Sequence, residues 1–181
     1  MDFQESLATI AQIGIALAGF SGLVVVLRKN AGPLNTIEKY RLSVLLATAF
    51  GAMFLALLPD TLHHLGFRGD LLWRASSALL LLFSVIFLFA WILSSRWFFH
   101  VAREIFNLRA FSLMTVGHLV NSLLQSMLTF GLWGDGKPGV YLLGLAWLLA
   151  HASQQFVRML FIYPKEPNTD ANNSNDSEMI T

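Results

Sequence analysis

The sequence contains no cysteine, and only 13% of its 181 residues are charged. Without a thiol it has no disulfides, thiolate metal sites, thiol-linked quinone reactions or cysteine nucleophiles. A soluble domain carries about 25% charged residues, so this chain is short of the groups that face water. It also has no P-loop, no glycine-rich dinucleotide motif and no basic patch beyond its loop charges. These absences argue against nucleotide and nucleic-acid binding.

Apolar residues, by contrast, make up 55% of the chain and occur in long runs. A membrane-spanning helix takes roughly 20 mostly apolar residues. Five windows meet this requirement: Leu7–Leu27, Leu42–Leu65, Leu72–Leu93, Ala110–Leu132 and Val140–Ile162. We therefore predict an all-α, polytopic integral membrane protein, with about five transmembrane helices in a compact bundle over residues 1–164. Residues 165–181 are rich in Asn, Ser and acidic side chains, which predicts a disordered polar tail.

The segments between the windows have the composition of turns. Gly134–Gly139 is a short Gly/Pro-rich stretch, which predicts an antiparallel hairpin of the last two helices. Arg96–Arg109 has apolar residues at helical spacing and fits either an interfacial amphipathic helix or an extension of a neighbouring helix. The N-terminus is acidic where a signal peptide would be basic, so we expect the first apolar segment to be retained.

Basic residues are distributed unevenly between the two sides that five spans define. One side receives nine: Arg28, Lys29, Lys39, Arg41, Arg96, Arg103, Arg109, Arg158 and Lys165. The other side receives three: Arg68, Arg74 and Lys137. Loops rich in Lys and Arg stay in the cytoplasm. This pattern predicts a plasma (inner) membrane protein with its N-terminus outside and its C-terminus in the cytoplasm.

The first window carries small residues on one helical face, namely Ala11, Gly14, Ala18 and Gly22. Small residues let membrane helices approach closely, so this face is expected to pack against another helix. That helix belongs either to the same protomer or to a second copy. The third window, by contrast, is Leu, Phe, Ile and Trp nearly all round from Leu79 to Leu93, which predicts a lipid-facing position.

Polar side chains form one stripe on each of the last two windows. The fourth presents Thr115, His118, Asn121, Ser122, Gln125 and Thr129, and the fifth presents His151, Gln154, Gln155 and Arg158. With a rise of about 1.5 Å per residue, the hairpin brings these stripes to similar depths, and Gln12 of the first window to the depth of Gln125. Two interpretations follow: a hydrogen-bonded network that holds helices together, or a polar path that passes protons or ions in a homo-oligomer.

Other chemistry remains open for the histidines. His118 and His151 on facing helices would suffice for bis-histidine haem ligation, the one cofactor that the sequence suggests. Asp60, His63 and His64 share a helical face and would bind a divalent metal if Asp70 supplied a fourth ligand. A solvated helix end explains the same three residues.

Gly19-Phe20-Ser21-Gly22 resembles the string around the serine of rhomboid intramembrane proteases. A nucleophilic serine needs a base within hydrogen-bond reach, for which His118 and His151 are the candidates. The chain has fewer predicted spans than the six of that family, and the glycines have a packing explanation. Enzymatic activity is therefore not our expectation.

The function expected from the sequence is that of a small channel-like or permeation-related protein, homo-oligomeric in the bilayer, with its polar path on the fourth and fifth helices. A structural or regulatory subunit that binds another membrane protein is one alternative. A haem or quinone redox protein is another.

The predicted orientation is testable through the C-terminus. A reporter that is active only in the cytoplasm, fused after Thr181, is expected to be active, because nine of the twelve basic residues lie on that side. A reporter that is active only outside the cytoplasm serves as the paired measurement. Activity of the second reporter alone would contradict the loop-charge argument.

Overall fold

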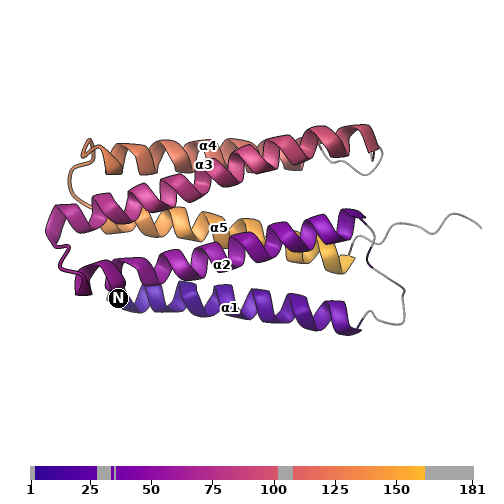
Figure 1. Ribbon diagram of the computed structural model, residues 1–181, viewed down its shortest axis with the longest axis horizontal. Coiled ribbons are helices and arrows are strands. Elements are labelled where there is room, and N and C mark those ends of the chain that lie inside the picture. The colour runs from indigo at the N-terminus through magenta and orange to yellow at the C-terminus, as the bar shows by residue number, and fades with distance from the viewer. Residues whose placement is uncertain (1–2, 28–33, 35, 102–107, 162–181) are drawn as a thin grey trace, which may run out of the picture.

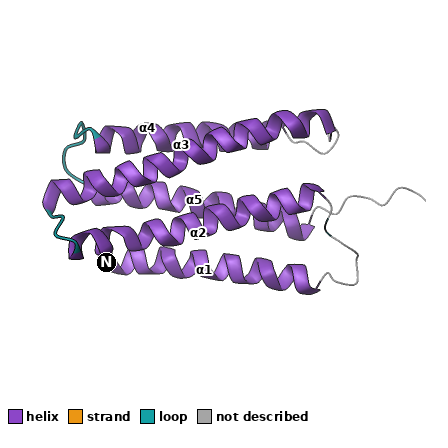
Figure 2. Ribbon diagram, viewed as in Figure 1, coloured by secondary structure: helices purple, strands orange, loops and turns teal. Residues whose placement is uncertain are grey.

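The structure is a computed structural model that describes residues 3–27, 34, 36–101 and 108–161. It contains α1 (Phe3–Leu27), α2 (Thr36–His64), α3 (Gly69–Val101), α4 (Leu108–Thr129) and α5 (Lys137–Phe161). No strand occurs in the described ranges (Figure 2). The predicted all-α fold is therefore confirmed. The predicted tail at 165–181 lies outside the described residues.

The five helices lie side by side along the long axis of the bundle, and successive helices run in opposite directions (Figure 1). α5 packs against all four other helices, whereas α1 packs against α2 and α5. α4 packs against α3 and α5. α5 is therefore the central helix of the bundle, and it is also one of the two that carry the predicted polar stripes.

Among the described residues, four helices are long and apolar enough to cross a membrane: α1, α2, α3 and α5. α4 is also long, with 22 residues or about 33 Å, but its polar stripe lowers its hydropathy below that of a typical span. It lies within the same bundle, between α3 and α5 in its contacts. The fold is thus that of a membrane-embedded helical bundle, and it is compatible with five spans.

All five helices begin before their apolar windows, because a hydropathy window covers only the apolar part of a helix. At its other end α4 stops at Thr129, before its window ends at Leu132. α2 begins at Thr36 and continues through Pro59 to His64, although its apolar run ends before Pro59. α3 continues to Val101, so the segment after Arg96 begins as an extension of the third helix. The remainder of that segment, residues 102–107, lies outside the described residues.

Two glycines end helices at the same end of the bundle. Gly66 follows α2 with φ +95° and Gly131 follows α4 with φ +74°. In each case two backbone hydrogen bonds close the last turn, as in Phe67 N–H to Leu62 O (3.0 Å). Positive φ favours glycine at this position of a C-terminal cap.

Three side chains then tie the same end together. The Arg74 Nε–H donates to the carbonyl oxygen of Thr129 over 2.9 Å. Lys137 and Asp70 form an ion pair. The first contact joins α3 to the end of α4, and the second joins the start of α3 to the start of α5.

α1 and α2 approach closely at Gly14. A Cβ on Gly14 would lie 2.7 Å from the carbonyl oxygen of Ala49, and Ala11 and Ala18 are buried on the same side. Gly22 does not share this contact, since its position is exposed and a Cβ there would meet nothing within 4 Å. Ser21 is buried in its place. The small-residue face thus packs within one chain for most of its length.

α3 has the lipid-facing position that its apolar composition predicted on one side only. Leu80, Ser84, Leu88 and Trp91 are buried, while Val85, Ile86 and Phe89 on the other side are exposed. A helix whose both faces are apolar gives no period from which to tell them apart. The buried face of α3 proves to enclose the polar groups of α4 and α5.

Gly14→Ala is expected to lower the free energy of unfolding by about 1–3 kcal/mol, because the added methyl group meets the Ala49 carbonyl oxygen and forces α1 from α2. Gly19→Ala on the same helix is the matched control: its Cβ meets nothing within 4 Å, and alanine favours the helix by up to ~1 kcal/mol. Thermal unfolding in mild detergent measures both. Equal stability of the two variants would contradict the close contact.

Candidate functional site

His118 of α4 and His151 of α5 are hydrogen-bonded to each other inside the bundle. Nε2 of His118 lies 2.7 Å from Nδ1 of His151, and both side chains are 0% exposed. One turn further along α5, the amide nitrogen of Gln155 lies 3.1 Å from Nε2 of His151. We call these three side chains the histidine cluster. The structure thus brings together three of the residues that the polar stripes predicted.

The hydrogen bonds of the histidine cluster run in one direction. An amide nitrogen donates and does not accept, so Gln155 donates to Nε2 of His151. The neutral His151 ring then carries its proton on Nδ1, which donates to Nε2 of His118. The His118 proton is left on Nδ1, which has no partner in the described ranges. The cluster is therefore a directional chain that ends in an unpaired N–H.

Aromatic rings enclose the two imidazoles. The Phe87 centroid lies 5.0 Å from that of His118 and 5.5 Å from that of His151. Trp91 stands perpendicular to His151 at 5.0 Å, and Trp147 lies edge-on to His118 at 6.0 Å. These rings shield the pair from bulk solvent and give a protonated imidazole π-faces to contact.

A second polar group, the amide cluster, consists of Ser84, Asn121 and Gln125. The Asn121 amide donates to the Ser84 hydroxyl over 3.3 Å, and the Gln125 amide donates to the carbonyl oxygen of Val140 over 3.1 Å. A Cβ on Gly144 would lie 2.6 Å from the Gln125 amide nitrogen, so this glycine makes room for the amides. Asn121 follows His118 by one helical turn, which places the amide cluster next to the histidine cluster along α4.

The remaining predicted polar residues lie around these clusters. The Ser122 hydroxyl and the Gln154 amide oxygen are buried atoms with no hydrogen-bond partner among the described residues. Arg158 is half-buried near Arg41 of α2, which also has Glu38 within electrostatic reach. The sequence did not predict that Arg158 of α5 lies near these charged residues of α2, because the depth of a residue in the membrane does not tell which helices pack together.

Gln12 does not join the network, which corrects its expected place near Gln125. Its side chain is exposed on α1, and no contact joins α1 to α4 in the described part of the chain. The sequence argument matched the depth of Gln12 in the membrane, but rotation about the helix axis directs the side chain outward.

The histidine pair does not fit bis-histidine haem ligation as it stands. Two imidazole nitrogens on one iron lie about 4 Å apart, since each bond to the metal is about 2 Å. The facing nitrogens here are 2.7 Å apart and hydrogen-bonded, which leaves no room for a macrocycle between them.

The described residues also contain no group of three or more metal-binding side chains around Asp60, His63 and His64. Their expected partner Asp70 is paired with Lys137.

The Gly19–Gly22 string does not form a catalytic serine site. The Ser21 hydroxyl donates to the Ala18 carbonyl oxygen of its own helix over 2.7 Å. Within the described ranges no hydrogen bond joins it to His118 or His151, which bond to each other. The serine is explained by its local bond in a buried position.

Sequence alone missed the contribution of α3. Ser84, Phe87 and Trp91 line the two clusters, and their spacing of three and four residues is that of one helical face. A serine in an otherwise apolar run was the available signal. Together, α3, α4 and α5 bury a histidine pair inside the membrane-embedded helical bundle. No family model, no curated protein and no solved structure matches the chain.

The direction of the hydrogen-bond chain is testable by ¹⁵N NMR of histidine-labelled protein. At about pH 8, above the ordinary imidazole pKa, we expect protonated Nδ1 and unprotonated Nε2 in both rings. His118→Gln and His151→Gln assign the signals. Protonated Nε2 on either ring would reverse the inferred direction.

Proposed function

We propose that this protein is permeation-related and that the histidine cluster passes protons through the bundle. The observation that carries the proposal is the 2.7 Å hydrogen bond between two fully buried imidazoles. Histidine is the side chain that titrates nearest to neutral pH, and each ring both binds and releases a proton. Amides and hydroxyls suffice to hold membrane helices together, whereas a directly bonded imidazole pair adds the capacity for proton transfer.

The hydrogen-bond geometry supports a balanced transfer. A proton arrives at Nε2 of His151 in place of the Gln155 hydrogen bond. The Nδ1 proton of His151 moves to Nε2 of His118, and the Nδ1 proton of His118 leaves on the far side. One proton enters and one leaves, and both rings end with their proton on Nε2. The amide of Gln155 then rotates to present its oxygen. Net flux in one direction needs one further step, in which both imidazole rings rotate and the Gln155 amide turns back, so that the chain again accepts a proton on the entry side.

Groups beyond the histidine cluster extend the route toward both ends of the bundle. Arg158 follows Gln155 by about one turn on α5, toward the end where α4 begins. In the other direction lie Asn121 and three buried oxygens that have no partner in the described ranges, those of Ser77, Ser122 and Gln125. Buried polar atoms of this kind are commonly satisfied by internal water. Water at these positions would connect the unpaired Nδ1 of His118 to that end.

The path proposed from the sequence lay in a homo-oligomer, whereas these clusters are buried within one chain. We therefore propose that each protomer carries its own route. A homo-oligomer remains part of the proposal through α1, because Gln12 is an exposed amide on an apolar helix. An amide of a second copy would give it the hydrogen-bond partner that lipid does not offer.

The test is proton flux into liposomes that contain the purified protein, driven by a potassium diffusion potential. His118→Gln and His151→Gln are each expected to reduce flux to the level of protein-free liposomes, because an amide makes hydrogen bonds but does not take up a proton at neutral pH. Both variants should keep the helical content of the parent protein. Their free energy of unfolding should lie within about 1–3 kcal/mol of the parent value.

His64→Gln is the matched control, since His64 is exposed at the end of α2 and bonds to its own helix at the Asp60 carbonyl oxygen. Its flux should equal that of the unchanged protein. Flux that persists in both cluster variants would sink the proposal, as would a folded, unchanged protein with no flux under any potential.

A further inference from the structure

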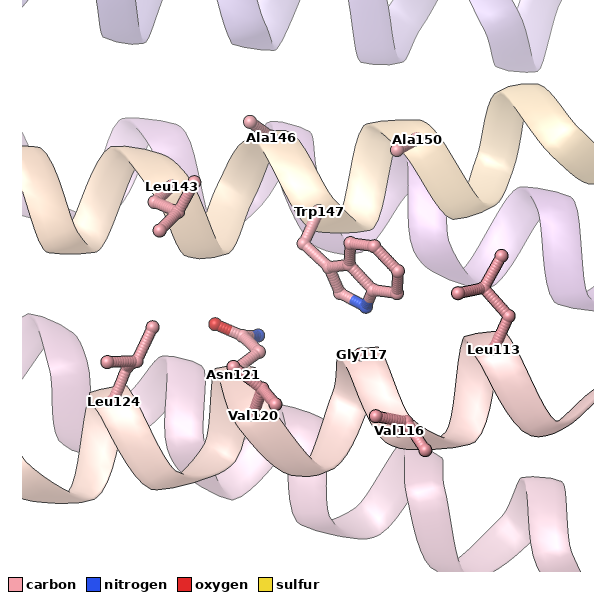
Figure 3. Close-up of a pocket in the computed structure, with 10 residues that line it drawn as sticks. All are labelled: Leu113, Val116, Gly117, Val120, Asn121, Leu124, Leu143, Ala146, Trp147 and Ala150. Atoms are coloured by element: carbon pink, nitrogen blue, oxygen red, sulfur yellow. The ribbon is translucent and has the colours of Figure 1, made fainter.

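A narrow groove runs along the outer surface between α4 and α5 (Figure 3). It has a volume of about 490 Å³ and is lined from Leu113 to Leu124 on α4 and from Leu143 to Ala150 on α5. The indole of Trp147 reaches from α5 toward Gly117 and forms one wall (Figure 3). A Cβ on Gly117 would collide with that indole, so the glycine is what admits the ring. The rest of the lining is aliphatic apart from the nearly buried Asn121.

The shape of the groove suits an extended occupant. The stretch from Leu113 to Leu124 is about 16 Å long at 1.5 Å per residue. Carbon atoms in contact lie about 4 Å apart, so a single hydrocarbon chain can lie along the groove in contact with both helices.

One end of the groove carries polar and positively charged groups. Arg109 is exposed and lies four residues before Leu113, which places it on the groove face of α4. Gln154 lies four residues after Ala150 on the groove face of α5, and its buried amide oxygen has no partner in the described ranges. α4 begins and α5 ends here, so both groups lie at the same end of the groove (Figure 1). An apolar slot with a cation at its mouth matches an anionic phospholipid.

We propose that the α4–α5 groove binds one anionic phospholipid, with an acyl chain along the groove, the phosphate at Arg109, and a headgroup hydroxyl that donates to the amide oxygen of Gln154. Lipid tails gain no hydrophobic free energy by moving from bilayer to groove, so the shape of the slot and the charge at its mouth must supply the preference. Basic side chains near the membrane surface attract anionic headgroups by about 1 kcal/mol each. This inference does not depend on proton transfer by the histidine cluster.

The experiment is native mass spectrometry of the full chain in mild detergent, titrated with phosphatidylglycerol or with phosphatidylcholine of identical acyl chains. We expect one phosphatidylglycerol per chain, bound more tightly than phosphatidylcholine. Arg109→Gln should weaken phosphatidylglycerol binding about fivefold, which corresponds to the roughly 1 kcal/mol that one cation contributes. It should leave phosphatidylcholine binding unchanged. Ala150→Phe should weaken the binding of both lipids, because the added ring fills the groove beside Trp147.

Two controls match these variants. Ala16→Phe adds the same ring at an exposed position on α1, and Arg68→Gln removes an exposed arginine at the other end of the bundle. Neither should change lipid binding. Equal binding of the two lipids by the unchanged protein, or unchanged binding in Arg109→Gln, overturns the proposal.

A dimer that Ala150→Phe dissociates without loss of lipid would show that a second copy fills the groove, and it also overturns the proposal. Arg109 is exposed, so its substitution tests the headgroup contact even if the Ala150 variant does not fold.

Discussion

Polar side chains inside a bilayer must find partners within the protein, and this constraint decides where α4 lies. α4 carries too many polar residues to match the hydropathy of the other four helices. Its histidine and amides are nevertheless buried, with His118 and Gln125 at 0% exposure. They reach that state by bonding to His151, to Ser84 and to the Val140 carbonyl oxygen. α4 is therefore held by polar contacts to α3 and α5, while its outer face stays apolar.

The central position of α5 follows from the same requirement together with close packing. Lipid tails are as apolar as leucine, so membrane helices associate through packing and hydrogen bonds rather than through the hydrophobic effect. α5 provides both: the Tyr141 hydroxyl donates to the Leu55 carbonyl oxygen of α2 over 2.6 Å, and Gly144 admits the amides of α4. Each such bond contributes about 0.6 kcal/mol in a membrane, so the arrangement depends on several of them acting at once.

The sequence predicted the number of helices, their approximate windows and the hairpin of α4 and α5, because apolar run length and Gly/Pro turns are local properties. It also predicted that the polar stripes of α4 and α5 meet, since depth along an antiparallel hairpin follows from a fixed rise per residue. It did not predict rotation about a helix axis. Gln12 is exposed on α1, and Trp91 is buried on a helix whose two sides are both largely apolar. Those outcomes depend on which helices pack together.

Trp147 connects the two proposed functions of the α4–α5 hairpin. Its indole lies edge-on to His118 on one side and lines the outer groove on the other. Its Nε1 is buried without a partner in the described ranges, as is Nδ1 of His118. Trp147 therefore lies between the buried histidine pair and the lipid-facing groove. An occupant of the groove would contact the same indole ring that borders His118, so the histidine pair and the groove share one wall.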